Sequence, residues 1–264
     1  MVFACTLFSS SKGNCTYVRS GNDRFLIDAG VSAKRIADAL KEIGTSLEEI
    51  DCIFVTHEHT DHIKGLQVVC KKYGIPVYAP YLSIRYIKQH FPELAPYLRE
   101  NNGGDTVTLS DTVITAYDTP HDSQASVCFR ITTPNCVIGY ATDIGYVSDN
   151  VWQALCGAEY VVVESNHDLE LLDNGPYPRA LKNRILSDYG HLSNCDCGQL
   201  LCRLAQNGTR RIVLAHLSEE NNRPPLALAA ARGTLMGSGF RVGEQVVVRV
   251  APPDEACEIV NIND

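Results

Sequence analysis

Apolar residues follow strand-like and helix-like patterns in turn along the chain. Short apolar or alternating runs bounded by Gly, Pro, Asn or Ser predict β-strands. These runs cover residues 3–8, 15–19, 25–28, 52–55, 76–79, 160–164, 211–215 and 245–250, with three or four further strands between 106 and 142. The first two runs predict a hairpin that turns at residues 9–14.

Apolar positions three and four residues apart predict helices between these strands. The first helix begins at the N-cap candidate Ser32, keeps Ile36 and Leu40 on its apolar face and stops at Gly44. Further helices are predicted over residues 66–73, 82–90, 195–205 and 225–236.

The order of the elements indicates the fold class. Strands come first and mixed βα units follow in each half, which predicts two sheets stacked face to face with helices outside. No internal repeat, low-complexity tract or linker interrupts the 264 residues, so we expect one domain over residues 1–264.

Composition indicates the cellular location of the protein and gives little information on the chemistry of its site. No apolar run approaches the roughly 20 residues of a membrane helix, and no signal peptide is evident at the start. The eleven cysteines lack the spacing of a disulfide framework, which favours a reducing compartment. We therefore expect a cytoplasmic protein with no membrane partner. The net charge of −8 argues against broad attraction to nucleic acid but allows an anionic substrate at a metal-bearing site.

Four ligand-type side chains stand in six positions directly after the apolar run 52–55. The segment reads His57-Glu58-His59-Thr60-Asp61-His62. His57 and His59 are two residues apart, so on an extended loop they point to the same side and can reach one ion. Asp61 and His62 follow, where the chain turns into a helix, and can reach a second ion. A solvated polar loop is the alternative, but it does not explain so many ligand-type residues after a buried strand.

Two ions need more ligands than this segment offers, because zinc takes about four ligands per ion. Three further candidates, His121, Asp143 and His216, each follow a predicted strand. Taken alone, each is a plausible turn or cap residue. Strand ends that converge at one edge of a sheet would bring them to the histidine segment.

The ordered motifs Asp28, the 57–62 segment, His121, Asp143 and His216 resemble those of the metallo-β-lactamase superfamily from end to end. The resemblance implies a four-layer αββα sandwich with a dinuclear metal centre. It implies that one ion is bound by His57, His59 and His121, the other by Asp61, His62 and His216, and both by Asp143. Asp28 would hold the ligand loop without binding metal.

Asp143 also narrows the branch of the superfamily. Members similar to true β-lactamases have cysteine or serine there, whereas aspartate resembles the phosphodiesterase, nuclease and glyoxalase II branches. Local strings at residues 9–15, 164–168, 174–178, 190–194 and 215–222 are similar to the YycJ/WalJ family. That family is implicated in 5′-to-3′ exonuclease activity on DNA. The interval between Asp143 and His216 leaves no room for the β-CASP insertion of RNase J-like nucleases, so the expected fold lacks it.

The resemblance implies a metal-dependent phosphodiesterase acting on nucleic acid or another phosphodiester, with two divalent ions (Zn, Mn or Fe) as cofactors. Two ions about 3.5–4 Å apart can hold a bridging hydroxide for in-line attack on phosphorus. Asp61 is then expected among the catalytic residues, together with the residues that supply a proton to the leaving oxygen. Similarity to tRNase Z implies that His191, oriented by Glu164, protonates the leaving oxygen, with His167 as the second candidate. The alternative for His191 is packing at a helix start.

Substrate contacts are expected from Ser11 and Lys12 in the first turn, and from Asn166 and Arg179. The first turn has the alternative of being only a hairpin turn. Arg179 belongs with Lys182 and Arg184 to a basic cluster that suits phosphates or forms a solvated helical face.

Three cysteines look at first like part of a zinc site. Cys195, Cys197 and Cys202 lack a fourth partner, and Cys195 and Cys202 are seven residues apart on the predicted helix. We therefore expect them to pack.

Two other functions stay open at this point. Thioester or lactone hydrolysis, as in glyoxalase II-like and lactonase-like members, uses the same ligands. A non-catalytic binding protein on the same scaffold is disfavoured, because the ligand set is intact.

Overall fold

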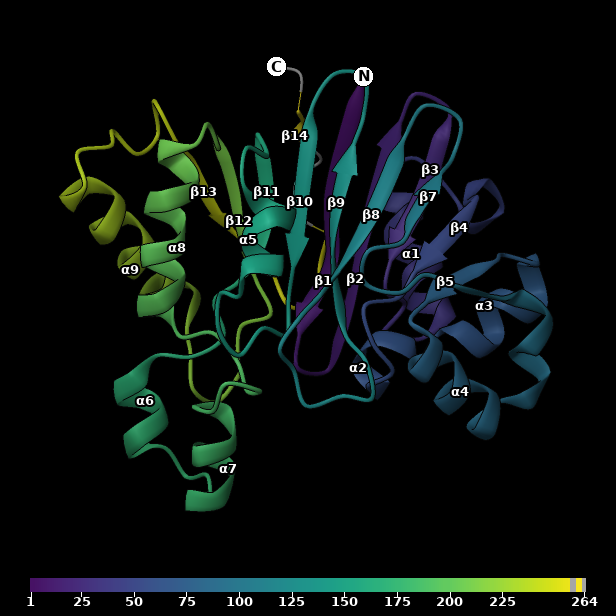
Figure 1. Ribbon diagram of the computed structural model, residues 1–264, viewed down its shortest axis with the longest axis horizontal. Coiled ribbons are helices and arrows are strands. Elements are labelled where there is room, and N and C mark those ends of the chain that lie inside the picture. Colours follow the sequence, from purple (N-terminus) through teal and green to yellow (C-terminus); the bar gives the residue numbers. More distant parts are fainter. Residues whose placement is uncertain (257–259, 263–264) are drawn as a thin grey trace.

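In the computed structural model, two seven-stranded sheets are stacked face to face with helices on both outer surfaces (Figure 1). The structure describes residues 1–256 and 260–262, so the other five positions of the expected 1–264 domain lie outside the described residues. The four layers confirm the predicted αββα sandwich.

The first sheet is built from the N-terminal half of the chain and one C-terminal strand. In spatial order its strands are β14 (Val260–Asn261), β1 (Val2–Ser10), β2 (Gly13–Ser20), β3 (Asp23–Ile27), β4 (Cys52–Phe54), β5 (Val77–Ala79) and β6 (Leu98–Glu100). Pairing is antiparallel from β14 to β3 and parallel from β3 to β6. The carboxyl ends of β3 to β6 therefore share one edge.

The second sheet follows the same plan with the rest of the chain. Its strands are β13 (Val247–Val250), β12 (Arg211–Ala215), β11 (Tyr160–Glu164), β10 (Val137–Ala141), β9 (Val127–Thr132), β8 (Val113–Asp118) and β7 (Thr106–Thr108). The strands β7 to β10 are antiparallel, as predicted for residues 106–142, and β10 to β13 are parallel. Because β8 and β10 both oppose β9, the carboxyl ends of β8, β10, β11 and β12 share one edge.

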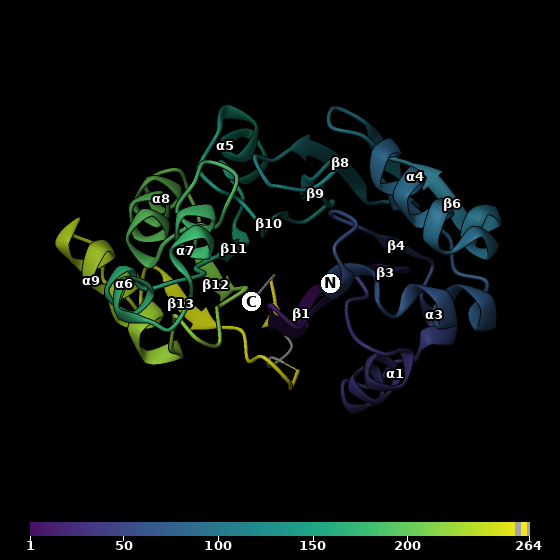
Figure 2. The ribbon, with the colours of Figure 1, turned by 90° about the horizontal axis from the view of Figure 1, so that it is seen from below.

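Helices cover the outer face of each sheet. On the first sheet these are α1 (Ala33–Glu42), η1 (Leu47–Glu49), α2 (Thr60–Ile63), α3 (Leu66–Tyr73), α4 (Tyr81–His90) and η2 (Pro92–Tyr97), and on the second α5 (Asp149–Leu155), α8 (Asn194–Gln206) and α9 (Pro224–Gly237). Figure 2 shows α8 and α9 on one side of the strands and α1, α3 and α4 on the other. Two short helices, α6 (Leu169–Asn174) and α7 (Arg179–Ile185), lie below α8 in Figure 1.

Alternation along the strands divides the core into three apolar clusters, one for each interface between layers. On β3, Phe25 and Ile27 belong to the cluster between the sheets, whereas Leu26 packs with the helices. On β11, Val162 faces the other sheet and Val161 faces the helices. Each buried side chain of this size stabilises the fold by about 1.5–3 kcal/mol. The stacked sheets thus give rigid mounting to whatever follows the strand ends.

The first hairpin differs from the prediction. Pairing continues to Ser9↔Asn14 and Ser10↔Gly13, so the turn is only Ser11–Lys12 and the predicted turn at residues 9–14 is wrong. The polar residues misled the prediction because Ser9, Ser10 and Asn14 are buried in the strands.

The helices α5 and α6 were not predicted, and α7 was considered only as the helical-face alternative for the basic cluster. Each has six or seven residues, which is too short to show an apolar period. Their visible signals are the N-caps of two of them: Ser148 accepts from Val151 N, and Asp168 accepts from Glu170 N and Leu171 N.

The cysteines within the described residues are free thiols. Cys197 and Cys202 pack in the core, but Cys195 is exposed in the first turn of α8, so the packing expected for Cys195 is wrong. Within the same range, no helix is long and apolar enough to span a bilayer.

Candidate metal centre

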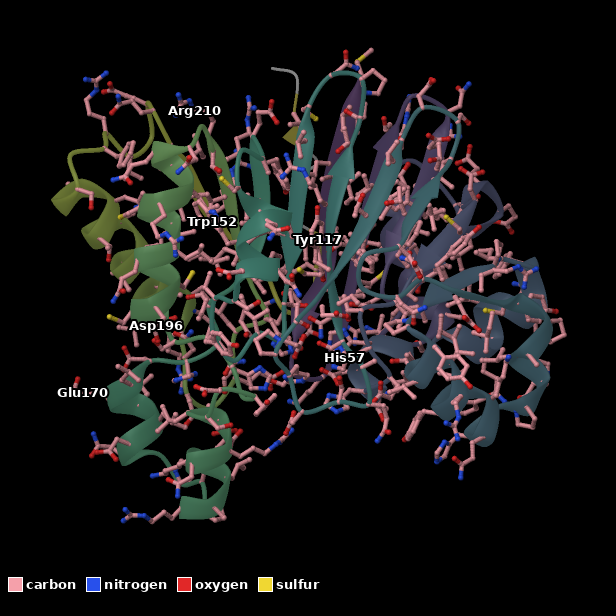
Figure 3. All side chains as sticks on the ribbon, in the orientation of Figure 1. His57, Tyr117, Trp152, Glu170, Asp196 and Arg210 are labelled. Atoms are coloured by element: carbon pink, nitrogen blue, oxygen red, sulfur yellow. The ribbon has the colours of Figure 1, made fainter. Side chains whose placement is uncertain are left out.

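Three histidine side chains meet where β4 and β8 end, at the lower end of the sheets, where Figure 3 labels His57. One ligand nitrogen of each of His57, His59 and His121 lies within 4.8 Å of the others. His57 Nε2 is 2.9 Å from His59 Nδ1. Neutral imidazole nitrogens around one point form a donor set that suits Zn²⁺ and similar divalent ions.

A second group lies beside the first. Ligand atoms of Asp61, His62 and His216 lie within 4.8 Å of one another. Asp143 lies between the two groups: its Oδ2 is 3.3 Å from His62 Nε2, and its Oδ1 is 3.7 Å from His121 Nε2. The carboxylate can therefore reach an ion in either group.

The donor atoms of these groups fit bound cations. His121 Nε2, His216 Nε2 and Asp143 Oδ2 are buried and have no hydrogen-bond partner among the described residues. Such atoms are costly to bury unpaired. Divalent ions at the two positions would satisfy all three.

The candidate ligands come from both sheets: residues 57–62 follow β4 of the first sheet and are called the first half, and the second half consists of His121, Asp143 and His216, which follow strands of the second sheet. Asp28 supports the first half. Its Oδ2 is 2.7 Å from His62 Nδ1, and since a carboxylate only accepts, this nitrogen carries the proton and Nε2 is left to bind metal. Asp28 Oδ1 also accepts from the backbone and hydroxyl of Thr56 at 2.8 and 3.1 Å. The Thr56 hydroxyl in turn lies 3.0 Å from His57 Nδ1. One buried carboxylate thus orients two ligand histidines.

Glu164 holds the second half in the same way. Its Oε1 is 2.7 Å from His216 Nδ1 and 2.9 Å from His191 Nδ1. Its Oε2 accepts from the backbone N–H groups of Ile144 and Leu192, both at 3.0 Å. The loops after β10 and before α8 are therefore tied to one carboxylate.

Backbone strain is concentrated at the same edge. Within the described residues, the non-glycine positions with positive φ are Asp28 (61°), Asp143 (56°) and His216 (54°), each just past the end of a strand. Such conformations cost about 1–3 kcal/mol each and persist where the surrounding structure enforces them. Here hydrogen bonds from neighbouring elements enforce them: Ser9 Oγ, for example, accepts from His216 N at 2.7 Å.

The ionisable groups in the centre shift one another's pKa values. Burial alone would raise the pKa of Asp143, but the neighbouring His216, His62 and His121 lower it. Burial would lower the pKa of His216, but Asp143, Asp61 and Glu164 raise it to about 10. Burial lowers the pKa of His121. The side chain of Asp143 is therefore ionised, and a cation that binds to His216 displaces a proton from that ring.

Comparison with known proteins places this geometry in a family. Residues 23–217 match the model of the beta-lactamase superfamily domain. The chain is 36% identical to the exodeoxyribonuclease YycJ of Bacillus anthracis over 250 residues, 94% of each chain. It is also 36% identical to the exodeoxyribonuclease WalJ of Streptococcus pneumoniae, over 97% of this chain and 96% of that protein.

The chain belongs to the metallo-β-lactamase superfamily. Solved structures agree on the fold: the metallo-β-lactamase fold protein YhfI from Bacillus subtilis superimposes with a TM-score of 0.72, covering 98% of this chain and 100% of that one, at 17% identity.

In this metallo-β-lactamase fold, the start of β2 approaches the candidate metal centre through Asn14. Asn14 Nδ2 is 3.2 Å from His62 Nε2. Lys12 is exposed and pairs with Glu219, and Ser11 is exposed beside it. Substrate contacts from Ser11 and Lys12 stay predictions, and Asn14 lies nearer to the ligands.

Asn166 and His167 are both buried behind the centre. Asn166 Nδ2 donates to the carbonyl of His216 at 2.9 Å, so this amide supports a ligand from behind. His167 has no partner on either ring nitrogen within the described residues, and burial lowers its pKa to about 4. Neither side chain is exposed to a substrate in this arrangement.

The predicted basic cluster lies on α7, which agrees with the helical-face alternative. Arg179 lines a groove of about 520 Å³ between α6 and α7. Lys182 Nζ donates to the carbonyl of Asp173 at 2.6 Å. Arg184 forms an ion pair with Asp122, next to His121 in the chain. At least one member of the cluster thus supports the ligand loop.

Two functional residues were missed by the sequence reasoning, although both stand in or beside the histidine segment. Thr56 links Asp28 to His57. Glu58 is 5% exposed and accepts from Ser83 Oγ at 2.7 Å and from Gln124 N at 2.6 Å. Their positions next to ligands were the available signal.

Proposed function

We propose that this protein is a metal-dependent phosphodiesterase that degrades DNA from the 5′ end. The proposal rests above all on two groups of ligand atoms with Asp143 between them, beside a histidine that a buried glutamate orients. As a member of this superfamily with exodeoxyribonuclease relatives, the chain is a metal-dependent hydrolase. The 5′ polarity rests on the family resemblance of the local strings.

The residues divide between two ions. His57, His59 and His121 would bind one ion, Asp61, His62 and His216 the other, and Asp143 both. When bound, the ions supply positive charge beside the phosphate and the acidity that makes water a nucleophile. The four positive charges of two such ions would exceed the two negative charges of the carboxylate ligands, Asp61 and Asp143. An anionic phosphodiester is then favoured although the chain as a whole carries −8.

His191 is the proton donor for the leaving oxygen. Its Nδ1 is held by Glu164 at 2.9 Å, which leaves Nε2 to face the substrate. Its side chain is 17% exposed, against 2% for His216 and 0% for His62. His191 therefore lies close to the candidate metal ligands and is also accessible to solvent. The leaving oxygen of a DNA strand is a poor leaving group and needs such a proton.

The test is a substrate panel with metal analysis. The protein is loaded with Zn, Mn or Fe, and turnover is measured on bis(p-nitrophenyl) phosphate, on end-labelled single-stranded DNA, and on S-acyl glutathione and lactones. We expect two ions per chain and turnover on both phosphodiesters. A 5′-end label should appear in mononucleotide at the earliest time points, and a 3′-end label only late.

The panel also decides between this proposal and its alternative. Higher kcat/KM on a thioester or lactone than on every phosphodiester would replace the nuclease assignment with a glyoxalase II-like or lactonase-like one. Early release of the 3′ label would reverse the polarity. Asp143→Ala, purified in parallel, excludes a contaminating nuclease.

A further inference from the structure

A groove of about 660 Å³ runs beside α4, and its lining is basic although the whole chain carries a net charge of −8. Arg85 and Lys88 supply positive charge, Tyr86 and His90 supply rings, and Gln124 closes the groove from the loop after β8. Within the described residues its lining includes no carboxylate. The groove is therefore a local site of attraction for anions on a chain whose net charge is −8.

The cations of this groove are not neutralised by the protein. Arg85 lies over the ring of Tyr81 at 5.9 Å, and neither Arg85 nor Lys88 forms an ion pair within the part of the chain that the structure describes. The groove between α6 and α7 differs: Asp173 is in its lining, and Lys182 is already bound to the carbonyl of that residue. Of these two grooves, the one on α4 is better suited to phosphates.

Aromatic faces accompany the charges. The rings of Tyr86 and His90 are stacked, with centroids 4.1 Å apart and planes at 29°. His90 is exposed and Tyr86 half-buried. Cations along a groove with ring faces beside them are the composition of sites that bind single-stranded nucleic acid, where phosphates meet the charges and bases stack on the rings.

One buried carboxylate joins this groove to the metal centre. Glu58 stands between His57 and His59 and accepts from Ser83 Oγ of α4 at 2.7 Å. Its other oxygen accepts from the backbone of Gln124 at 2.6 Å, three residues after His121. The wall of the groove and the loops that carry three ligands are thus fixed to the same side chain. Figure 2 shows α4 on the opposite side of the molecule from α6 and α7.

We propose that the groove on α4 binds the single-stranded segment of a nucleic-acid substrate next to the scissile phosphodiester. This inference rests on the proposed function, which makes the substrate a phosphodiester. Arg85 and Lys88 bind backbone phosphates, and Tyr86 with His90 stacks against a base. DNA and RNA share this chemistry, so the test includes both.

The metal-loaded protein is tested with fluorescein-labelled single-stranded oligonucleotides, DNA and RNA, that carry phosphorothioate linkages to slow cleavage. Fluorescence anisotropy gives Kd at several salt concentrations for wild type, for Arg85→Ala with Lys88→Ala, and for a control, Lys71→Ala with Lys72→Ala. The control removes the same charge from α3, whose end leads to the start of β5, at the edge opposite the ligands.

We expect the groove variant to raise Kd on the order of tenfold and to reduce the slope of log K against log salt by about 1.4, since each phosphate contact on a single strand contributes about 0.7. The ratio of kcat/KM on unmodified DNA to that on bis(p-nitrophenyl) phosphate should fall with it. The control should keep both values. His90→Ala should raise Kd about fivefold without changing the salt slope, because it removes stacking and not charge.

Equal Kd and salt slope in the groove and control variants would overturn the inference, and so would a blunt duplex that competes as well as a single strand. The proposed function fails separately, if the wild type hydrolyses neither DNA nor bis(p-nitrophenyl) phosphate. Stronger binding of either DNA or RNA names the natural strand.

Discussion

Asp28 in the first sheet and Glu164 in the second are both fully buried carboxylates at the carboxyl end of a parallel strand. Each holds Nδ1 of one candidate metal ligand at 2.7 Å, His62 in the first sheet and His216 in the second. Both carboxylates therefore fix a histidine ring so that its Nε2 faces the candidate metal centre.

The remaining hydrogen bonds of the two carboxylates differ. Asp28 uses them on Thr56, so everything it holds is enclosed and belongs to the ligand loop. Glu164 also holds His191, which is partly exposed. The first sheet thus contributes candidate ligands alone, whereas the second contributes candidate ligands and the proposed proton donor on the same support. Substitutions in the two halves should separate metal binding from proton transfer.

Asp143→Ala should have the largest effect, because Asp143 reaches both groups of ligands. We expect loss of bound metal and a fall in turnover beyond the roughly 10–100-fold that removing an outer partner of a ligand costs. Metal analysis and kinetics on bis(p-nitrophenyl) phosphate measure both. Asp38→Ala, on the exposed face of α1, is the matched control and should behave as wild type. Full metal content in Asp143→Ala would contradict a shared ligand.

His191→Ala should separate the two roles of the second half. Loss of a general acid costs about 10²–10⁴-fold on a DNA strand and far less on p-nitrophenyl esters, because p-nitrophenolate leaves without a proton. Both metals should be retained. His167→Ala is measured beside it and should not show this contrast. Equal losses of His191→Ala on both substrates would assign His191 to packing.

The same comparison explains which parts of the centre were predictable from sequence. The first half has four of its ligand-type residues in one string, and spacing alone indicates a metal site. The second half has His121, Asp143 and His216 after three separate strands. Their positions made them candidates, and the resemblance assigned them to the two ions and gave Glu164 its role. Most strands and the long helices were predicted because their apolar patterns are long enough to be seen, whereas the short strands β6 and β14 were not predicted.

The contacts that were not predicted are made with partners that lie far away in the sequence. The sequence does not indicate that Asn166 binds the carbonyl of His216, or that Lys12 turns to Glu219. Polarity in the first hairpin reads as a turn, although Asn14 is buried against the ligands. Glu58 alternates away from the histidines as a strand-like period requires, but its partners come from α4 and from the loop after β8.

Asp28→Asn and Glu164→Gln are the matched pair that sharpens the comparison. Each replaces a charged acceptor by an amide whose NH₂ faces a donor. We expect each to weaken metal binding about 10–100-fold, measured by titration against a chelator. Glu164→Gln should also lose more turnover on DNA than on bis(p-nitrophenyl) phosphate at saturating metal, because His191 is no longer held. The same loss ratio in Asp28→Asn would mean that the two supports are not functionally distinct.

Glu58→Gln should have the smallest effect, and it tests whether a residue inside the ligand string acts on metal at all. Its carboxylate accepts from Ser83 Oγ and from Gln124 N. In the amide variant the oxygen still accepts from Gln124 N, and the NH₂ can donate to Ser83 Oγ while that hydroxyl donates to the carbonyl of Ala125. The variant therefore loses only the extra strength of hydrogen bonds to a charged acceptor, about 1 kcal/mol of unfolding free energy, measurable by urea denaturation. Metal content should stay at the wild-type value, unlike in Asp143→Ala. Ser83→Ala removes one of the two bonds from the other side, so the double variant should lose less stability than the sum of the single variants. Additive losses, or metal loss as large as in Asp143→Ala, would place Glu58 in a different role from the one that its hydrogen bonds indicate.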